Sequence, residues 1–258
     1  MGDVVIEYRD VHKAFDVPVL SGVDLEVRRG EVIAIVGPSG TGKSVLLKTT
    51  IGLITPDRGD VLVEGESVYG SPARMQDIRR RAGYVFQYAA LFDSMNTYEN
   101  VAYGIPEDQA KKLGPREVLR RVVEALRDVN LDPAVVMKKL PAELSGGMRK
   151  RVGLARALVG QPKILLYDEP VTGLDPVNTA AVDRLIVEIN QRHDVTSLIV
   201  THDIEGVLNI CDRIALLESG RLRFVGTPRE FKESTDPLVH AFADRSQAHL
   251  VASGDVVV

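Results

Sequence analysis

The stretch from residue 31 to residue 53 constrains the fold of this chain more than any other. A continuous apolar run within Glu31–Val36 predicts a strand buried on both faces of a parallel sheet, and Val45–Leu53 has an apolar helical pattern. The loop between them fits G-x-x-x-x-G-K-[ST] and consists of Gly37, Pro38, Ser39, Gly40, Thr41, Gly42, Lys43 and Ser44. Strand, loop and helix in this order predict an α/β fold with a phosphate-binding loop.

The chemistry of this loop follows from its residue types. Its glycines let backbone N–H groups turn inward around phosphates, and the helix N-terminus adds a partial positive charge. We expect Lys43 to reach the β- and γ-phosphates of a nucleotide and the Ser44 hydroxyl to bind Mg²⁺. The alternative is a glycine-rich turn that matches the pattern by chance, and the flanking strand and helix argue against it.

Two carboxylates follow a second apolar strand, Ile164–Tyr167. Asp168 is placed to bind Mg²⁺ or its waters, and Glu169 can polarise an attacking water as a general base. Two acidic residues at an ordinary strand end are the alternative, but the phosphate loop in the same chain favours a nucleotide site.

The run Leu-Ser-Gly-Gly-Met, Leu144–Met148, precedes a predicted helix over Met148–Val159. Ser145, Gly146 and Gly147 would form a second helix start that binds an anion, with the Ser145 hydroxyl as donor. One chain has no obvious use for two separate phosphate cradles, whereas two copies arranged head to tail do, because each can cap the other's ATP. A helix N-cap that contains glycines is the alternative.

The charged run that follows, Arg149–Arg151, is predicted to lie on a solvated helix face.

The composition is that of an ordinary globular protein of 258 residues, 45% hydrophobic and 26% charged. A net charge of −4 gives no global signal for nucleic acid, and one cysteine, Cys211, excludes an internal disulfide framework and fits a reducing compartment. The N-terminus lacks the pattern of a signal peptide, and no apolar run reaches the ~18–20 residues that span a bilayer. We therefore expect a soluble protein that acts at a membrane only through a partner.

Strand and helix patterns alternate on both sides of a helical middle region. Further strands are predicted at Val4–Tyr8, Val23–Val27, Asp60–Val63, Thr196–Thr201 and Arg213–Leu217, and further helices at Arg116–Val129, Pro176–Arg192, Ile204–Ile210, Pro228–Lys232 and Leu238–Asp244. This alternation predicts a mainly parallel sheet. We expect a core domain over residues 1–226, a helical subdomain inserted at about residues 88–160, and a helical tail over residues 227–258 whose end is loose.

These motifs occur in the order found in the ATP-binding cassette (ABC) ATPases, which the chain resembles from about Val4 to Arg223. The resemblance implies a P-loop core, an antiparallel β-subdomain near the N-terminus, a helical subdomain, and ATP hydrolysis with Mg²⁺. It implies further roles for four residues. Phe15 would stack on adenine, and its distance ahead of the phosphate loop favours this role over that of a core phenylalanine. Gln87 would contact Mg²⁺ and the attacking water, His202 would contact the γ-phosphate, and Asp175 would lie at a dimer interface.

Finer features resemble the ATPases of the Mla/MCE lipid-transport systems. They include Phe86–Asn96, the run from Leu144 to Ala157, Leu166–Pro176, and Asp236-Pro237 leading to Phe242. This resemblance implies a homodimer on the cytoplasmic face of an inner membrane, bound to an MlaE-like integral permease that works with an MCE-domain protein. Leu91, Phe92, Met95 and Tyr98 would line the groove for the permease, or else pack in the helical core.

Other classes of protein remain as alternatives. The run that begins Leu144–Met148, called the signature from here on, also resembles that of the osmoprotectant importers. A non-transport ABC regulator of nucleic acid or the ribosome is a further possibility. About 100 residues without sustained heptads or cysteines separate the phosphate loop from the signature, which argues against repair and chromosome-organising relatives. A P-loop kinase or GTPase has no use for the Leu-Ser-Gly-Gly run.

Overall fold

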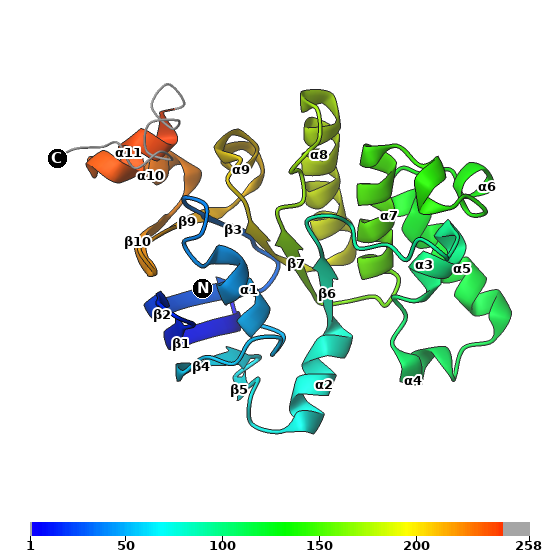
Figure 1. The fold of residues 1–258 in the computed structure, drawn as a ribbon, viewed down its shortest axis with the longest axis horizontal. Coiled ribbons are helices and arrows are strands. Elements are labelled where there is room, and N and C mark those ends of the chain that lie inside the picture. The colour runs from blue at the N-terminus through cyan, green and yellow to red at the C-terminus, as the bar shows by residue number, and fades with distance from the viewer. Residues whose placement is uncertain (1, 245–258) are drawn as a thin grey trace. The chain divides into compact units, whose positions relative to one another are not determined.

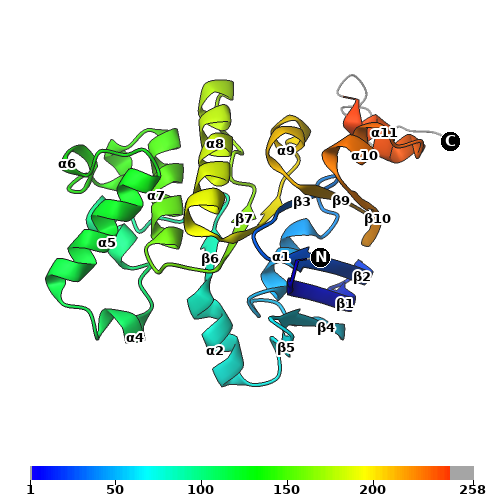
Figure 2. The same ribbon diagram turned by 180° about the vertical axis from the view of Figure 1, so that it is seen from behind.

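The computed structural model describes residues 2–244, and the chain divides into two compact units (Figures 1 and 2). The first unit contains the residues up to Ile78 and those from Thr196 onward, and the second contains Arg79–Val195. Within the described residues, no helix is both long enough and apolar enough to cross a membrane.

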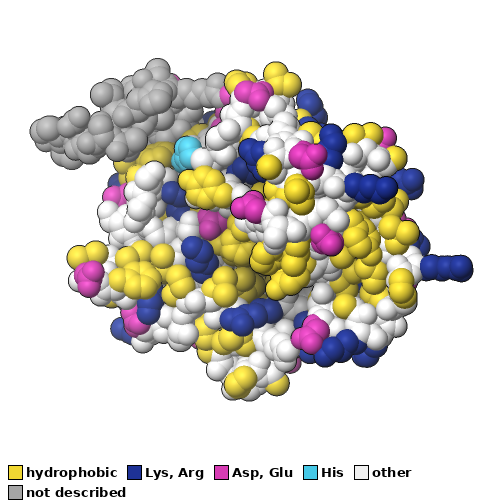
Figure 3. All heavy atoms as spheres, turned by 45° about the vertical axis from the view of Figure 1, so that its right-hand side comes forward, with side chains coloured by type: hydrophobic (Ala, Val, Ile, Leu, Met, Phe, Trp, Pro, Cys, Tyr) yellow, Lys and Arg dark blue, Asp and Glu magenta, His cyan; other side chains and the backbone are white. Residues whose placement is uncertain are grey.

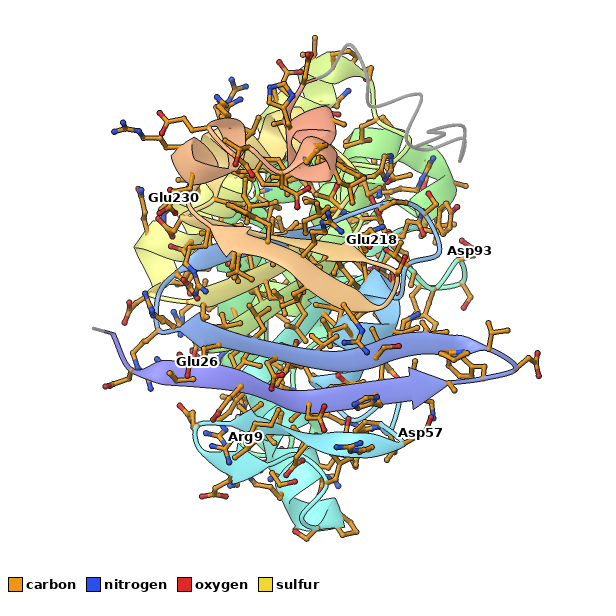
Figure 4. The ribbon with its side chains drawn as sticks, turned by 90° about the vertical axis from the view of Figure 1, so that its left-hand side faces the viewer. Arg9, Glu26, Asp57, Asp93, Glu218 and Glu230 are labelled. Atoms are coloured by element: carbon orange, nitrogen blue, oxygen red, sulfur yellow. The ribbon has the colours of Figure 1, made fainter. Side chains whose placement is uncertain are left out.

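An antiparallel sheet forms one part of the first unit. Its strands, in the order β2-β1-β4-β5, are β1 Val4–Ala14, β2 Pro18–Arg28, β4 Arg58–Val63 and β5 Glu66–Ser67. Apolar residues such as Ile6, Val23 and Val61 are fully buried, because alternate side chains of a strand point to one face. Arg9, Glu26 and Asp57 lie on the exposed face, which Figure 4 shows toward the viewer. The antiparallel sheet expected near the N-terminus is confirmed.

The second sheet of the first unit is mainly parallel. Its strands, in the order β10-β9-β3-β8, are β3 Val32–Val36, β8 Thr196–Val200, β9 Arg213–Glu218 and β10 Arg221–Gly226. β3 pairs in parallel with β8 and β9, and every residue of β3 and β8 is buried. The continuous apolar runs follow from this burial, since both faces of such strands are covered. Two helices belong to the same unit, α1 Lys43–Thr49 and α9 Ile204–Ile210.

The second unit pairs two parallel strands, β6 Ala82–Val85 and β7 Ile164–Asp168. Its helices are α3 Thr97–Ala102, α4 Glu107–Ala110, α5 Pro115–Asp128, α6 Pro133–Val136, α7 Gly146–Leu158 and α8 Pro176–His193, with a 3₁₀ turn at Pro141–Glu143. α3 and α5 pack against α7, as both ribbon views show. Gly104 permits a close approach, because a Cβ there would lie 1.9 Å from the Arg156 carbonyl oxygen.

Most predicted elements lie within a few residues of their observed positions, but several elements of the described residues had no predicted counterpart, among them α2, β6 and β10. Helix α2, Pro72–Arg81, is strongly polar with one buried residue, Ile78, so it carries little apolar periodicity. β6 has only four residues. β10 follows β9 after a two-residue turn at Ser219 and Gly220, and both turn residues have positive φ.

Two short helices follow β10 in the first unit, as predicted. They are α10 Pro228–Lys232 and α11 Pro237–Ala243. The rings of Phe224 and Phe231 meet edge to face with centroids 5.3 Å apart, and Phe231 is fully buried. The predicted loose end of the tail lies outside the described residues, and the predicted domain boundaries stay a prediction.

Candidate functional site

The phosphate loop of the first unit leaves the carboxyl end of β3 and leads into α1. Gly37 has φ +151°, and a Cβ on it would lie 2.1 Å from the Leu217 carbonyl oxygen. Gly42 has φ +97°, and a Cβ there would lie 2.8 Å from a methyl carbon of Val19. Any other residue at these two positions would clash with the neighbouring strands, so the loop needs glycine to fit between them.

Lys43 lies inside this loop with 6% of its surface exposed. Its ammonium donates hydrogen bonds to the carbonyl oxygens of Gly37 and Pro38, both at 2.8 Å. The Thr41 hydroxyl donates to the same Pro38 oxygen at 2.9 Å. Ser44, the next residue of α1, stands in the first helical turn. A positive charge and a helix start therefore share one loop, which is the donor set that phosphate binding requires.

His202 lies at the same edge of the first unit's sheet as the phosphate loop. Ile35 of β3 pairs with Val200 of β8 in parallel, so the residues that follow the two strands leave at neighbouring positions. His202 is exposed there, two residues after β8, and Asp203 caps α9. The structure thus brings together two elements that are far apart in the sequence.

Phe15 lies between β1 and β2 of the first unit and is 60% exposed. The Lys13 ammonium lies 5.4 Å from the centroid of its ring. This exposure excludes the core alternative for Phe15. Its ring is available to stack on a planar ligand, and its contact with adenine stays a prediction.

The second unit gathers its candidate residues at the carboxyl ends of β6 and β7. Val85 pairs with Tyr167 in parallel, so Gln87 and Glu169 each follow a paired residue by two positions. Asp168 ends β7 and is 7% exposed. Tyr84 of β6 donates its hydroxyl hydrogen to Asp168 Oδ2 at 2.8 Å, which fixes the orientation of the carboxylate.

Glu169 is held by its neighbours in an unusual backbone conformation. Its φ is +51°, in the left-handed region that residues with a Cβ seldom adopt. The Thr172 hydroxyl donates to Glu169 Oε2 at 3.1 Å, and the Thr172 N–H lies 3.4 Å from the Glu169 carbonyl oxygen. Strained residues of this kind cluster at active sites, and Glu169 is the residue predicted as general base.

The signature run forms the start of α7 in the second unit. Ser145 is the N-cap of α7 and accepts a hydrogen bond from the Met148 N–H at 3.2 Å. Gly147 is buried, and a Cβ on it would lie 2.7 Å from Asn178 Oδ1. Asn178 belongs to the first turn of α8, whose N-cap is Asp175. The predicted signature and Asp175 therefore lie close together, at two adjacent helix starts.

Asp175 is exposed and accepts several hydrogen bonds. The Asn178 amide donates to its carboxylate at 2.5 Å, and the N–H groups of Val177 and Asn178 donate at 3.0 Å. These contacts, that of the Asn178 side chain first, hold the pKa of Asp175 below its ordinary value. Asp175 is thus a charged cap at physiological pH, and its place at a dimer interface stays a prediction.

The solvated helix face predicted for Arg149–Arg151 is wrong for Lys150, whereas Arg149 is exposed as predicted. The Arg149 guanidinium donates to the Leu144 carbonyl oxygen at 2.6 Å. Lys150 is half-buried, and its ammonium donates to the carbonyl oxygen of Gln87 and lies 3.4 Å from that of Glu169. Burial lowers the pKa of Lys150, and the Glu169 charge opposes this. The charge pattern missed these contacts because carbonyl acceptors leave no mark in a sequence.

The donor set fits a hard divalent cation. The Ser44 hydroxyl, the Gln87 side-chain oxygen and the Asp168 carboxylate are all oxygen ligands. Mg²⁺ is usually held by one or two carboxylates together with substrate phosphates and water. Asp168, already oriented by Tyr84, supplies such a carboxylate.

Comparison with known proteins decides the family. A family model described as ABC transporter matches residues 20–172. The chain belongs to the ABC transporter ATPase family. An ABC transporter ATPase binds and hydrolyses ATP, and the fold class and the enzyme activity expected from the sequence are confirmed.

The names of two relatives of this ABC ATPase point to different molecules. It is 39% identical over 261 residues to the chloroplastic protein TRIGALACTOSYLDIACYLGLYCEROL 3 of Arabidopsis thaliana, across 95% of this chain and 74% of that protein. It is 43% identical over 241 residues to the probable ribonucleotide transport ATP-binding protein mkl of Mycobacterium leprae, across 93% of this chain and 68% of that protein.

Two solved structures share the fold of this ABC ATPase. CbiO1 of Clostridium perfringens, part of the ABC transporter complex cbiONQ, matches with a TM-score of 0.82 and 30% identity over 96% of this chain and 99% of its own. The ATP-binding cassette MJ0796, dimeric in a post-hydrolysis state with ADP and Pi, matches with a TM-score of 0.78 and 28% identity over 87% of this chain and 99% of its own.

Substitution of Gly37 by Ala tests the phosphate loop. Overpacking a close contact costs about 1–3 kcal/mol, so we expect Gly37→Ala to weaken ATP binding by about tenfold or more. A titration with a fluorescent ATP analogue measures this. Gly65→Ala is the control, because Gly65 also has positive φ, +79°, but nothing lies within 4 Å of its added Cβ. Wild-type affinity in Gly37→Ala would contradict the role of the loop.

Proposed function

We propose that this ABC ATPase closes as a homodimer around two Mg·ATP and thereby powers a membrane permease. One observation carries the proposal: the described residues include two separate helix starts suited to anions, α1 after Gly42 and α7 after Ser145. A single ATP has no use for the second start within one chain. In a head-to-tail pair, the second start of each copy contacts the ATP held by the other.

The first unit binds ATP in the proposed mechanism. Backbone N–H groups of the loop and the Lys43 ammonium hold the β- and γ-phosphates, and the exposed ring of Phe15 stacks on adenine. To bind, the phosphates take over an ammonium that now donates to Gly37 and Pro38. The carbonyl oxygens are neutral acceptors, whereas phosphate oxygens carry negative charge, so the attraction between opposite charges favours the exchange.

Hydrolysis uses residues that the two units place at the ends of their parallel strands. Glu169 polarises the attacking water as general base, and Gln87 orients that water. Lys43 and His202 stabilise the charge that develops on the γ-phosphate. Ser44, Gln87 and Asp168 would hold Mg²⁺, which neutralises phosphate charge when bound.

The second copy completes each site in this proposal. Ser145, Gly146 and Gly147 of one copy contact the γ-phosphate bound by the other, with α7 supplying N–H groups and its positive end. Asp175 lies at the interface between the copies, next to the signature of its own chain. The similarity to MJ0796, which is dimeric with ADP and Pi, supports this arrangement.

An exposed apolar surface of the second unit is the proposed contact with the permease. Tyr88 is 82% exposed, Tyr103 63% and Phe92 40%, and the rings of Phe92 and Tyr103 lie 4.8 Å apart. Figure 3 shows hydrophobic side chains among charged ones on the face turned forward there. Leu91, Met95 and Tyr98 are partly buried. Such surfaces suit an apolar partner segment, and they would hold the chain on the cytoplasmic face of an inner membrane.

Lipid is the proposed cargo, moved by an MlaE-like permease with an MCE-domain protein. Two observations support this: the resemblance of Phe86–Asn96 and of the tail to the Mla/MCE ATPases, and the similarity to an Arabidopsis protein that is named after a galactolipid. The similarity to mkl, a probable ribonucleotide transport protein, makes ribonucleotides the alternative class of cargo.

Substitution of Ser145 by Arg tests the two-copy site. The phosphate loop is untouched, so we expect wild-type ATP binding, while the added cation blocks the partner's γ-phosphate. Loss of transition-state donors costs about 10²–10³ in rate, so ATPase activity should fall by at least about that factor. Ser145→Ala is the control for the lost helix cap, which is worth about 1 kcal/mol. If Ser145→Arg hydrolysed ATP at the wild-type rate, the signature would serve only as a helix cap, and the two-copy site would be contradicted.

Capture of the tagged chain from its native membranes tests partner and cargo together. We expect an integral permease and an MCE-domain protein to co-purify, with lipid bound to the complex. Mass spectrometry of the proteins and thin-layer chromatography of the extract measure this. A permease without lipid would instead favour a small-solute importer, and nucleic acid without any membrane protein would favour a non-transport regulator.

A further inference from the structure

One face of α7 lies against the segment that carries Gln87. Lys150, Gly153 and Arg156 are spaced three residues apart, so they share this face. The Lys150 ammonium donates to the Gln87 carbonyl oxygen. Arg156 donates to the carbonyl oxygens of Ala89 and Ala90 at 2.7 and 2.6 Å. Gly153 permits the close approach, because a Cβ on it would lie 3.1 Å from the Ala89 Cβ.

The segment after Gln87 needs such support. Ala89 and Ala90 have φ of +61° and +47°, and each residue in this region costs of order 1–3 kcal/mol unless its surroundings impose the conformation. Three of the four carbonyl oxygens from Gln87 to Ala90 accept hydrogen bonds from cations of α7. Helix α7 therefore fixes the path of this segment.

Lys150 differs from Arg156 because it also lies near the second strained segment. Its Nζ is 3.4 Å from the carbonyl oxygen of Glu169, whose φ is +51°. An ammonium has three donors, so one lysine can serve both carbonyl oxygens. Arg156 donates to carbonyl oxygens on the Gln87 side, and among the described residues no hydrogen bond joins it to Glu169.

We propose that Lys150 is a positioning residue that holds the backbone of Gln87 and the backbone of Glu169 at a fixed separation. The inference rests on the proposed function, in which Gln87 orients the attacking water and Glu169 polarises it. Lys150 touches neither the water nor the nucleotide and acts through these two residues. It lies five residues after Ser145 on the same helix, so the helix that contacts the partner's ATP also fixes the water-activating pair.

Lys150→Met tests the kinetic consequence. Misplacement of a reacting group by about 1 Å can cost about 10²-fold in rate, so kcat should fall by about 10- to 100-fold. KM for Mg·ATP should stay within about twofold, because the phosphate loop is intact. Lys150→Arg should recover much of kcat, since it keeps the charge and the donors. Lys112→Met, which removes an exposed lysine from the same unit, is the matched control.

Amide hydrogen exchange gives a readout that does not depend on hydrolysis. The Ala89 N–H donates to the Phe86 carbonyl oxygen and the Thr172 N–H to that of Glu169, so these amides report on the two segments. Lys150→Met should speed exchange at both amides. Arg156→Met should speed exchange at Ala89 and leave Thr172 unchanged.

The outcomes separate the inference from the function on which it rests. Wild-type kcat in Lys150→Met, or faster exchange at Ala89 without any change at Thr172, would overturn the role of Lys150. A rise in KM that matches the fall in kcat would also overturn it. If instead Glu169→Gln hydrolysed ATP as fast as the wild type, the proposed mechanism would fail while the exchange experiment still tested the contacts of Lys150.

Discussion

Parallel pairing of buried strands is the constraint on which the rest of this structure depends. β3 pairs with β8 in the first unit, and β6 pairs with β7 in the second. Because parallel strands end at the same edge, the segments that leave them are neighbours whatever their distance in the chain. The phosphate loop and His202 meet in this way, and so do Gln87 and Glu169. Long-range pairing of apolar runs thus sets the positions of the polar residues.

The local parts of this arrangement could be predicted from the sequence, and the non-local parts could not. Strand β3, the loop and α1 are contiguous, so pattern and glycine spacing indicated them together. The hydrogen bond from Tyr84 to Asp168 joins residues 84 positions apart. Nothing in the sequence distinguishes such a tyrosine from one that packs in the core. Lys150 was predicted to be a solvated charge. Its acceptors are backbone carbonyl groups, which every residue has, so the sequence gives no sign of the contact. The sequence favoured stacking for Phe15, and its exposure in the structure then excluded the core alternative.

Helix α7 combines two tasks that the sequence presents separately. Its start carries the signature, with Ser145 as cap and Gly147 against α8. Its body carries the cations that hold the strained segment after Gln87. Because close-packed elements transmit strain, we expect a shift of the signature to reach the Gln87 segment within the second unit. In the proposed mechanism, this would link contact with a second copy to the geometry of the residues that activate the water.

The central claim is that two copies of the chain share each ATP, and the mass of the ATP-bound state tests it most directly. Glu169→Gln removes the proposed general base and should keep ATP binding, so the closed state should accumulate. Size-exclusion chromatography with light scattering should show the mass of two chains with Mg·ATP and of one chain without nucleotide. A single-chain mass with Mg·ATP bound, at protein concentrations that span the micromolar range, would contradict the account.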